Sequence, residues 1–174
     1  QEEVVAGSIV ANREVTITSE LSRKVTSVLF DEGSYVQKGE ALYQLDNAEL
    51  LARLKQVQAD LYLAQLNEQR LSALLKTETV KQEEYDVAYA RLQSLLATQE
   101  LIKIDLDKTT IRAPFAGKIG LTKVHAGAFV SPGMALVNLQ EQGTVKIQFA
   151  VSEKYTDVLG KGRKVTFSTI HSKE

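Results

Sequence analysis

Residues 32–45 read EGSYVQKGEALYQL, and residues 126–139 read AGAFVSPGMALVNL. Both stretches belong to a longer internal repeat, in which residues 16–45 align with residues 110–139 at a constant offset of 94. Nine of the 30 aligned positions are identical, whereas chance at average composition gives about two. The repeat therefore predicts that one structural unit occurs twice in the chain.

Each copy alternates apolar and polar residues like a series of short strands separated by turns. Gly33 and Gly127 occupy predicted turns, and Gly39 and Gly133 follow six positions later. Glycine supplies the positive φ that such tight turns need. Two halves with four short strands each predict a small β-sandwich.

The segment between the two copies has a different composition. Residues 47–108 contain no glycine or proline, and they hold 14 of the 22 leucines. Seam residues with alternating spacings of three and four predict two coiled-coil helices. The first stripe is Leu50, Leu54, Val57, Leu61, Ala64, Glu68, Leu71 and Leu75, and the second is Tyr85, Ala88, Leu92, Leu95, Gln99, Ile102 and Leu106.

These two stripes predict an antiparallel helical hairpin over residues 47–108, with its tip at about residues 76–80. A capping box starts the first helix, with Asp46 as the N-cap and Glu49 at the third helical position. The alternative is a pair of core helices in a bundle. Because a bundle needs more than two helices, and arms of about 45 Å exceed a small domain, we expect the hairpin to project.

The glycine motifs and the inserted hairpin together resemble a known family. Glu32 to Leu42 and Leu45-Asp46 resemble the first half of a biotinyl/lipoyl-type domain, and Thr110 to Ile119 with Ala126 to Val130 and Gly133 resemble the second. A lipoyl motif split by a coiled-coil hairpin is typical of the membrane fusion, or periplasmic adaptor, proteins of the HlyD-like family. The motif turns that this resemblance implies are Gly33, Gly39, Gly117, Gly127 and Gly133. When the two copies are aligned, Arg23 corresponds to Gly117, a position at which the family has glycine in both halves.

The predicted tip carries a candidate docking pair. Arg70 and Leu74 are four residues apart and share one helix face, so they offer a charged fork beside an apolar side chain. From spacing alone, a solvated arginine beside an ordinary seam residue is the simpler interpretation. Adaptors of the resistance-nodulation-division type carry an Arg-x3-Leu-x6-Ser signature at the tip, which implies contact with a TolC-like outer-membrane channel. Arg70 and Leu74 match it, while Lys81 stands at the serine position.

The two ends of the chain predict a further β-structure. Val145, Ile147, Phe149 and Val151 alternate as in a half-buried strand, residues 152–155 resemble a short capped helix, and residues 165–167 begin another strand. The run from residue 4 to residue 9 is a candidate partner strand. We therefore expect an α+β protein, with part of a β-barrel in residues 1–15 and 141–174 and a lipoyl-like sandwich in residues 16–46 and 109–140. We expect the barrel to continue beyond Glu174.

Composition excludes several classes of function. A net charge of −1 provides no basic field for nucleic acid. The chain has no cysteine and two histidines, His125 and His171, so we predict no metal site and no cofactor. Asp107-Lys108 weakly resembles the Asp-Lys pair of a lipoyl attachment site, but it lies at the end of the second predicted helix. Since no catalytic motif occurs either, we predict that the chain is not an enzyme.

The resemblance implies an adaptor that links an inner-membrane efflux transporter to a TolC-like channel and supports export of small molecules. It implies several copies side by side, as a trimer or a hexamer, in the periplasm, with an N-terminal anchor to the inner membrane that lies outside these residues. The alternatives are an adaptor of an ABC-type or metal-ion exporter, a lipoyl or biotinyl carrier domain, and a purely structural coiled-coil protein.

Overall fold

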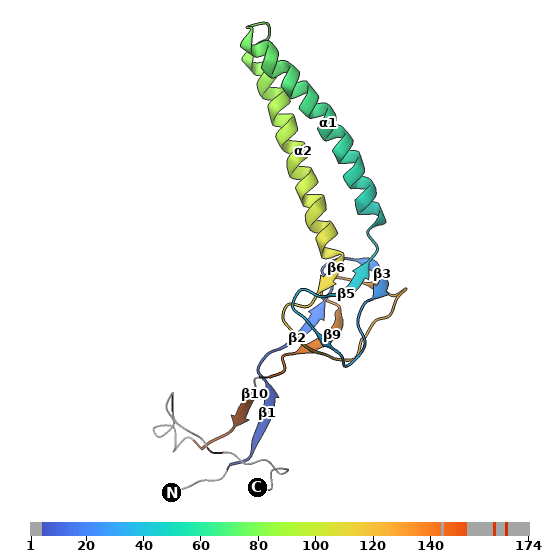
Figure 1. Cartoon of the computed structure of the whole chain (residues 1–174), viewed down its shortest axis with the longest axis vertical. Helices are drawn as coiled ribbons and strands as arrows, with labels where there is room; N and C mark the ends of the chain where they lie inside the picture. The colour runs from blue at the N-terminus through green and yellow to red at the C-terminus, as the bar shows by residue number, and fades with distance from the viewer. Residues whose placement is uncertain (1–4, 144, 153–161, 163–165, 167–174) are drawn as a thin grey trace.

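The computed structural model describes residues 5–143, 145–152, 162 and 166 of the 174-residue chain. Three parts follow one another along its long axis (Figure 1): a helical hairpin, a β-sandwich at the base of the hairpin, and a two-stranded ribbon on the opposite side of the sandwich. The predicted helix at residues 152–155 and the predicted strand at residues 165–167 lie outside the described residues, apart from single positions.

The sandwich is built from eight short strands, four from each half of the repeat. The first half contributes β2 (Glu14–Thr18), β3 (Arg23–Val28), β4 (Tyr35–Val36) and β5 (Ala41–Leu45). The second half contributes β6 (Thr110–Arg112), β7 (Gly117–Ile119), β8 (Phe129–Val130) and β9 (Ala135–Gln140). All of the pairings between these strands are antiparallel.

The two halves interleave. One sheet has the order β2-β9-β7-β4 and the other has the order β6-β5-β3-β8, so each sheet takes two strands from each half. Under the offset of 94, the strands β2, β9, β7 and β4 of the first sheet correspond to β6, β5, β3 and β8 of the second. The two sheets therefore have equivalent strand orders. Neither half can form its sheet alone, so the segment inserted between them must return the chain to its starting point.

The repeat extends to individual backbone hydrogen bonds. Gly33 N–H donates to the carbonyl of Ile119 at 3.1 Å, and its repeat equivalent Gly127 N–H donates to the carbonyl of Val25 at 2.8 Å. Likewise, the edge pairing of Tyr35 with Lys118 is matched by the pairing of Lys24 with Phe129. The two sheets are therefore copies of one structure.

The core lies between the two sheets and also follows the repeat. The fully buried pairs Leu42/Leu136, Leu45/Leu139, Val36/Val130 and Val25/Ile119 are repeat equivalents. Tyr43 differs in chemistry from its repeat equivalent, because that residue is Val137, which has no hydroxyl group. Its buried hydroxyl shares a hydrogen bond with Thr122 Oγ1 at 2.7 Å and donates to the carbonyl of Leu136 at 3.3 Å. Burial raises the pKa of Tyr43.

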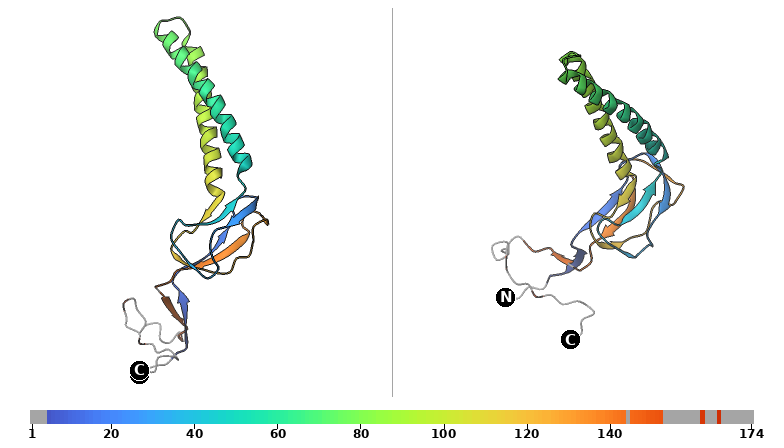
Figure 2. Two further views of the ribbon diagram at one scale, coloured as in Figure 1. Left: turned by 45° about the vertical axis from the view of Figure 1, so that its right-hand side comes forward. Right: turned by 45° about the horizontal axis from the view of Figure 1, so that its top comes forward.

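The hairpin consists of α1 (Ala48–Lys76) and α2 (Gln82–Lys108). Figures 1 and 2 show both helices projecting from the sandwich side by side. Every residue of the two predicted seams is buried or half-buried, while most of the remaining helix surface is exposed. The seam thus holds the arms together, and the projecting hairpin is confirmed against the helical bundle.

The first helix begins one residue later than predicted, and the capping box is wrong. Asp46 directly follows β5, and its N–H donates to the carbonyl of Lys24 at 2.8 Å instead of to the Glu49 side chain, as a capping box requires. Asn47 is therefore the N-cap residue, and its side chain makes no capping hydrogen bond. Asp46 Oδ1 instead accepts from the N–H of Ala48 at 3.0 Å. Glu49 forms ion pairs with Arg23 at 3.4 Å and with Arg53 at 3.0 Å.

Four of the five motif glycines lie at turns, and the fifth does not. Gly33, Gly39, Gly127 and Gly133 have φ of 74°, 83°, 96° and 80°. Gly117 instead lies in strand β7, where a Cβ atom would come 2.3 Å from the carbonyl oxygen of Gln140. Its assignment as a turn is wrong: glycine is needed there because another backbone passes against it.

The ribbon pairs β1 (Gly7–Ala11) with β10 (Val145–Phe149) in antiparallel register. The N-terminal run thus pairs with the alternating strand after the sandwich, as the sequence predicted. The sandwich extends slightly further than residues 16–46 and 109–140, because β2 begins at Glu14.

Candidate functional site

The hairpin tip is a short loop from Thr77 to Lys81 that joins the two helices. The carbonyl of Leu74 organises it, accepting from the N–H of Thr77 at 3.2 Å, from the N–H of Thr79 at 2.9 Å and from Thr77 Oγ1 at 2.9 Å. The hydroxyls of Thr77 and Thr79 share a further hydrogen bond of 2.8 Å. These bonds satisfy the Leu74 carbonyl, one of the last carbonyls of α1, and give the tip a defined shape.

Glu78 occupies an unusual conformation at the apex of this loop. Its φ is 54°, and its N–H donates to the carbonyl of Leu75 at 3.0 Å. Together with the bond from Thr79 to Leu74, this forms a Schellman motif, whose left-handed position is normally glycine. A side chain in this conformation costs roughly 1–2 kcal/mol. Sequence reasoning missed this position because no glycine marks it.

The three predicted docking residues lie at different levels of the hairpin. Leu74 is half-buried in the last turn of α1, and Lys81 is an exposed N-cap residue of α2. Arg70 is exposed and lies six residues before the end of α1, which is about 9 Å further down the helix axis. The tip therefore presents an apolar side chain and a cation at its end, with a second cation below them.

A polar contact crosses the seam just below the tip. Tyr85 Oη donates to Glu68 Oε1 at 2.9 Å, so the polar residue in the first stripe meets the first residue of the second stripe. This hydrogen bond raises the pKa of Tyr85, and partial burial and the negative charge of Glu68 act in the same direction. A polar pair in an apolar seam favours one register of the two helices over its alternatives.

Ion pairs at the base join the hairpin to the sandwich. Arg23 pairs with Glu49 near the start of α1, and Lys108 at the end of α2 pairs with Glu20 at 3.6 Å. Glu20 and Arg23 flank the turn between β2 and β3. One turn of the sandwich therefore contacts both helices of the hairpin.

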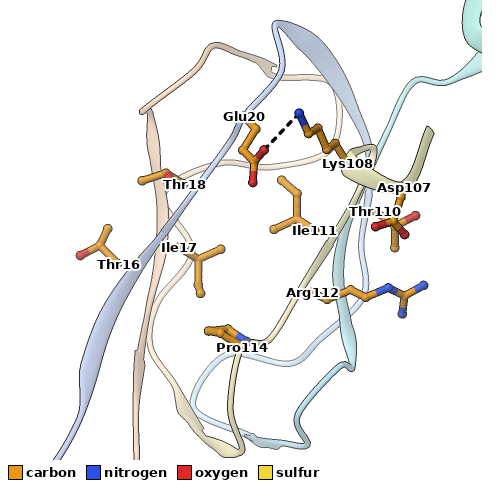
Figure 3. Close-up of a pocket in the computed structure, with 10 residues that line it drawn as sticks. All are labelled: Thr16, Ile17, Thr18, Glu20, Asp107, Lys108, Thr110, Ile111, Arg112 and Pro114. Atoms are coloured by element: carbon orange, nitrogen blue, oxygen red, sulfur yellow. Dashed lines mark ion pairs between the residues drawn. The ribbon is translucent and has the colours of Figure 1, made fainter. Parts of the chain in front are cut away.

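A hollow of about 340 Å³ lies beside the second of these pairs. Figure 3 shows the residues that line it. It lies between edge strands β2 and β6 and is lined by repeat equivalents such as Thr16 with Thr110 and Ile17 with Ile111. Lys108 lines it and forms the ion pair with Glu20, so the lysine weighed as an attachment site lies at the end of α2 beside the sandwich.

Metal-ligating side chains do not gather into a group of three or more within the described residues. His125 lies in the turn before β8, where its carbonyl accepts from the N–H of Ala128, and His171 lies outside the part of the chain that is described. Neither α1 nor α2 is apolar enough over a sufficient length to cross a membrane.

Comparison with known proteins identifies the family. The family described as "RND MFP, barrel-sandwich hybrid domain" matches residues 13–142, which include the whole sandwich and the hairpin. The chain therefore belongs to the membrane fusion protein family of the resistance-nodulation-division (RND) type.

Three individual proteins are similar to it. An uncharacterised protein of Haemophilus influenzae is 32% identical over 94% of this chain and 43% of its own length. The toluene efflux pump periplasmic linker protein TtgD of Pseudomonas putida is 35% identical over 78% of this chain and 35% of its own length. A MacA–MexA chimeric protein with the α-hairpin of Pseudomonas aeruginosa MexA superposes with a TM-score of 0.81 at 28% identity, over 87% of this chain and 56% of the chimera. The chain thus spans less than half the length of the two sequence relatives.

Proposed function

We propose that this chain is part of a periplasmic adaptor that links an inner-membrane efflux transporter to a TolC-like outer-membrane channel and supports the export of small molecules. The observation that carries the proposal is the hairpin, which projects from the sandwich and ends in Leu74 and Lys81 above Arg70. A similar relative that is named as an efflux pump periplasmic linker supports this role. The role is mechanical, and no catalytic residue is assigned.

In this proposal, each part of the chain contacts a different partner. The hairpin of residues 47–108 docks the channel, and Arg70, Leu74 and Lys81 form the docking face. The sandwich of residues 16–46 and 109–140 packs against neighbouring copies. Residues 1–15 and 141–174 belong to a barrel that faces the transporter. An N-terminal anchor holds the complete protein at the inner membrane.

Docking at the tip has a clear physical basis. The half-buried Leu74 side chain gains from further burial, and a neighbouring cation can pair with an acidic or carbonyl acceptor on the partner. The hydrogen bonds on the Leu74 carbonyl hold the tip loop in place before contact, which lowers the entropy cost of binding.

Site-specific photocrosslinking in intact cells tests this function. A photoreactive residue at Leu74 or Lys81 should capture an outer-membrane channel, while the same residue at exposed Lys55, near the base of α1, should not. Leu74→Glu should abolish export without lowering the amount of protein. Absence of channel capture at both tip positions, or equal capture at Lys55, would contradict the proposal. Crosslinking to a metal-ion or ABC-type system instead would favour the alternative exporters.

A further inference from the structure

One residue of the tip loop has a backbone conformation that its own side chain makes costly. Among the described residues, Glu78 is the only one other than glycine whose φ is positive, and the six further residues with positive φ are all glycines. Glu78 lies at the far end of the hairpin, between α1 and α2 (Figure 1). A Cβ atom crowds the following carbonyl oxygen in this left-handed region, so the position favours glycine or asparagine.

The shape of the loop does not require a carboxylate. The loop is closed by backbone hydrogen bonds and by the hydroxyls of Thr77 and Thr79, and Thr79 Oγ1 also donates to the carbonyl of Thr77 at 3.4 Å. None of these bonds uses the Glu78 side chain. Glycine at this position would form the same Schellman motif without the steric cost. The fold of the loop therefore does not explain why a glutamate is present.

Charges within the hairpin do not offset the cost either. Among the described residues, the Glu78 carboxylate forms no ion pair, although Lys76 and Lys81 lie two and three positions away. Glu78 directly follows Thr77, the C-cap residue of α1, and this end of the helix dipole favours a cation. The first turn of α2 has acidic residues of its own. We therefore expect the isolated protein to be less stable with glutamate than with glycine at this position.

We propose that Glu78 is a specificity-determining residue of the tip, and that its carboxylate pairs with a basic side chain at the mouth of the outer-membrane channel. The inference rests on the proposed function and deepens it, because it names a contact that the docking residues Arg70, Leu74 and Lys81 do not include. Residues in strained backbone conformations cluster at binding and switch sites, where the strain is part of the function.

The Schellman motif fixes the place at which the carboxylate is presented. The N–H groups of Glu78 and Thr79 donate to the carbonyls of Leu75 and Leu74 at 3.0 and 2.9 Å, so the backbone of Glu78 is held before contact. Only the torsions of the glutamate side chain then have to be ordered on binding, which keeps the entropy cost low. Because hydrogen bonds to an ionised acceptor are the strong ones, a single contact of this kind can contribute measurably to docking.

Glu78 also gives the tip a charge pattern that discriminates between partners. The exposed charges from Lys76 through Glu78 to Lys81 alternate in sign. A channel mouth with a basic residue opposite Glu78 is complementary to this pattern, whereas an acidic residue at that place is repelled. Without the carboxylate, residues 76–81 would carry only positive charge and would accept any acidic mouth. The glutamate therefore narrows the choice of channel.

Two measurements on one variant test the proposal, because Glu78→Gly removes the strain and the carboxylate together. In the purified protein, hydrogen exchange should show the amide of Thr79, which the Schellman motif holds, protected about three- to tenfold more than in the wild type. In intact cells, a photoreactive residue at Leu74 should capture the channel about tenfold less. A role in folding alone would move both readouts in the same direction, whereas a role in docking moves them in opposite directions.

Further substitutions separate the charge from the backbone. Glu78→Gln keeps the shape and the strain but removes the charge, so it should lower capture about tenfold and leave the protection of Thr79 unchanged. Glu78→Asp keeps the charge and should retain capture within about threefold. The matched control is Asp60→Asn, which removes an exposed carboxylate from the middle of α1 and should leave capture unchanged.

Several results would overturn the proposal. Wild-type capture by both Glu78→Gly and Glu78→Gln would mean that the carboxylate has no part in docking. Loss of capture by Glu78→Gly without a gain in the protection of Thr79 would contradict the argument from strain. These results differ from failure of the unaltered tip to capture any channel, which would contradict the proposed function as well.

Charge reversal identifies the group that faces Glu78. Glu78→Lys should abolish capture and export, because it sets a cation against the basic side chain of the partner. Suppressor mutations in the channel gene should then replace a basic residue at the mouth with an acidic or neutral one. Suppressors that leave every basic residue of the mouth unchanged would show that Glu78 does not pair with a cation there.

Discussion

The two halves of the sandwich share one motif but differ at the point where each ends. In the second half, β9 continues to Gln140, whose carbonyl lies against Gly117. In the first half, the chain leaves the sheet at Asp46 to enter α1, which frees the equivalent space. Arg23 occupies it, with its side chain 20% exposed, and pairs with Glu49. One position of the repeat therefore serves sheet packing in one half and attachment of the hairpin in the other.

Whether the two halves of the repeat contribute equally to the core can be tested at Leu42 and Leu136, which are repeat equivalents with 0% exposure. Replacing either with alanine should lower the free energy of unfolding by about 3 kcal/mol, through lost burial and the cavity left behind. Urea denaturation followed by tyrosine fluorescence measures this, since Tyr43 lies in the core. Costs that differ by more than about 1 kcal/mol would show that the two halves do not contribute equally to the core.

Gly117→Ala tests the asymmetry directly. The new Cβ atom would meet the Gln140 backbone at 2.3 Å, so the strands must separate, at an expected cost of about 2–3 kcal/mol in the same urea assay. A neutral result would mean that the end of β9 moves aside without penalty, and the close approach would then not explain the glycine.

The turns should behave alike in both halves. Gly33 and Gly127 have φ of 74° and 96°, and a Cβ atom at either would have no neighbour within 4 Å. Alanine should therefore cost only the backbone strain, about 1–2 kcal/mol at each site. A difference between the two midpoints would reveal a contact that only one of the turns makes.

The smallest effect is expected at Arg23. Its pair with Glu49 is partly exposed, and such pairs contribute about 0–1 kcal/mol. Arg23→Ala should lower stability by no more than this, and the loss should shrink at high salt because the ion pair is screened. A loss that is large and independent of salt would point to packing of the arginine stem instead.

Much of the fold was predictable, because its signals are local or repeated. The leucine stripes, the break between them and the alternating strand at residues 145–149 follow from periodicity in residues that are close in sequence. The pairing of β1 with β10 was only a candidate, because the two strands are far apart in the sequence. The capping box that the sequence predicted at Asp46 was wrong. Asp46 has the right chemistry, but its N–H is held by Lys24 of a distant strand.

The features of the candidate site likewise fall into those that had a sequence signal and those that had none. The family signature marked Arg70 and Leu74 as candidate docking residues, whereas their spacing alone favoured a solvated arginine beside an ordinary seam residue, and their docking role stays a prediction. The strained backbone of Glu78 had no sequence signal, since left-handed turns are normally marked by glycine. The contact between Tyr85 and Glu68 had a weak signal in the one acidic residue of the first seam.

By itself, the sequence determined that a β motif occurs twice and that a coiled-coil hairpin separates the copies, because periodicity and repetition are properties of the chain alone. Only the tertiary structure decided that the two copies exchange strands between sheets, that Gly117 needs its glycine where Arg23 does not, and that one turn holds both helices. These features depend on which distant backbone segment passes beside a residue, and that is decided when the sheets pack together.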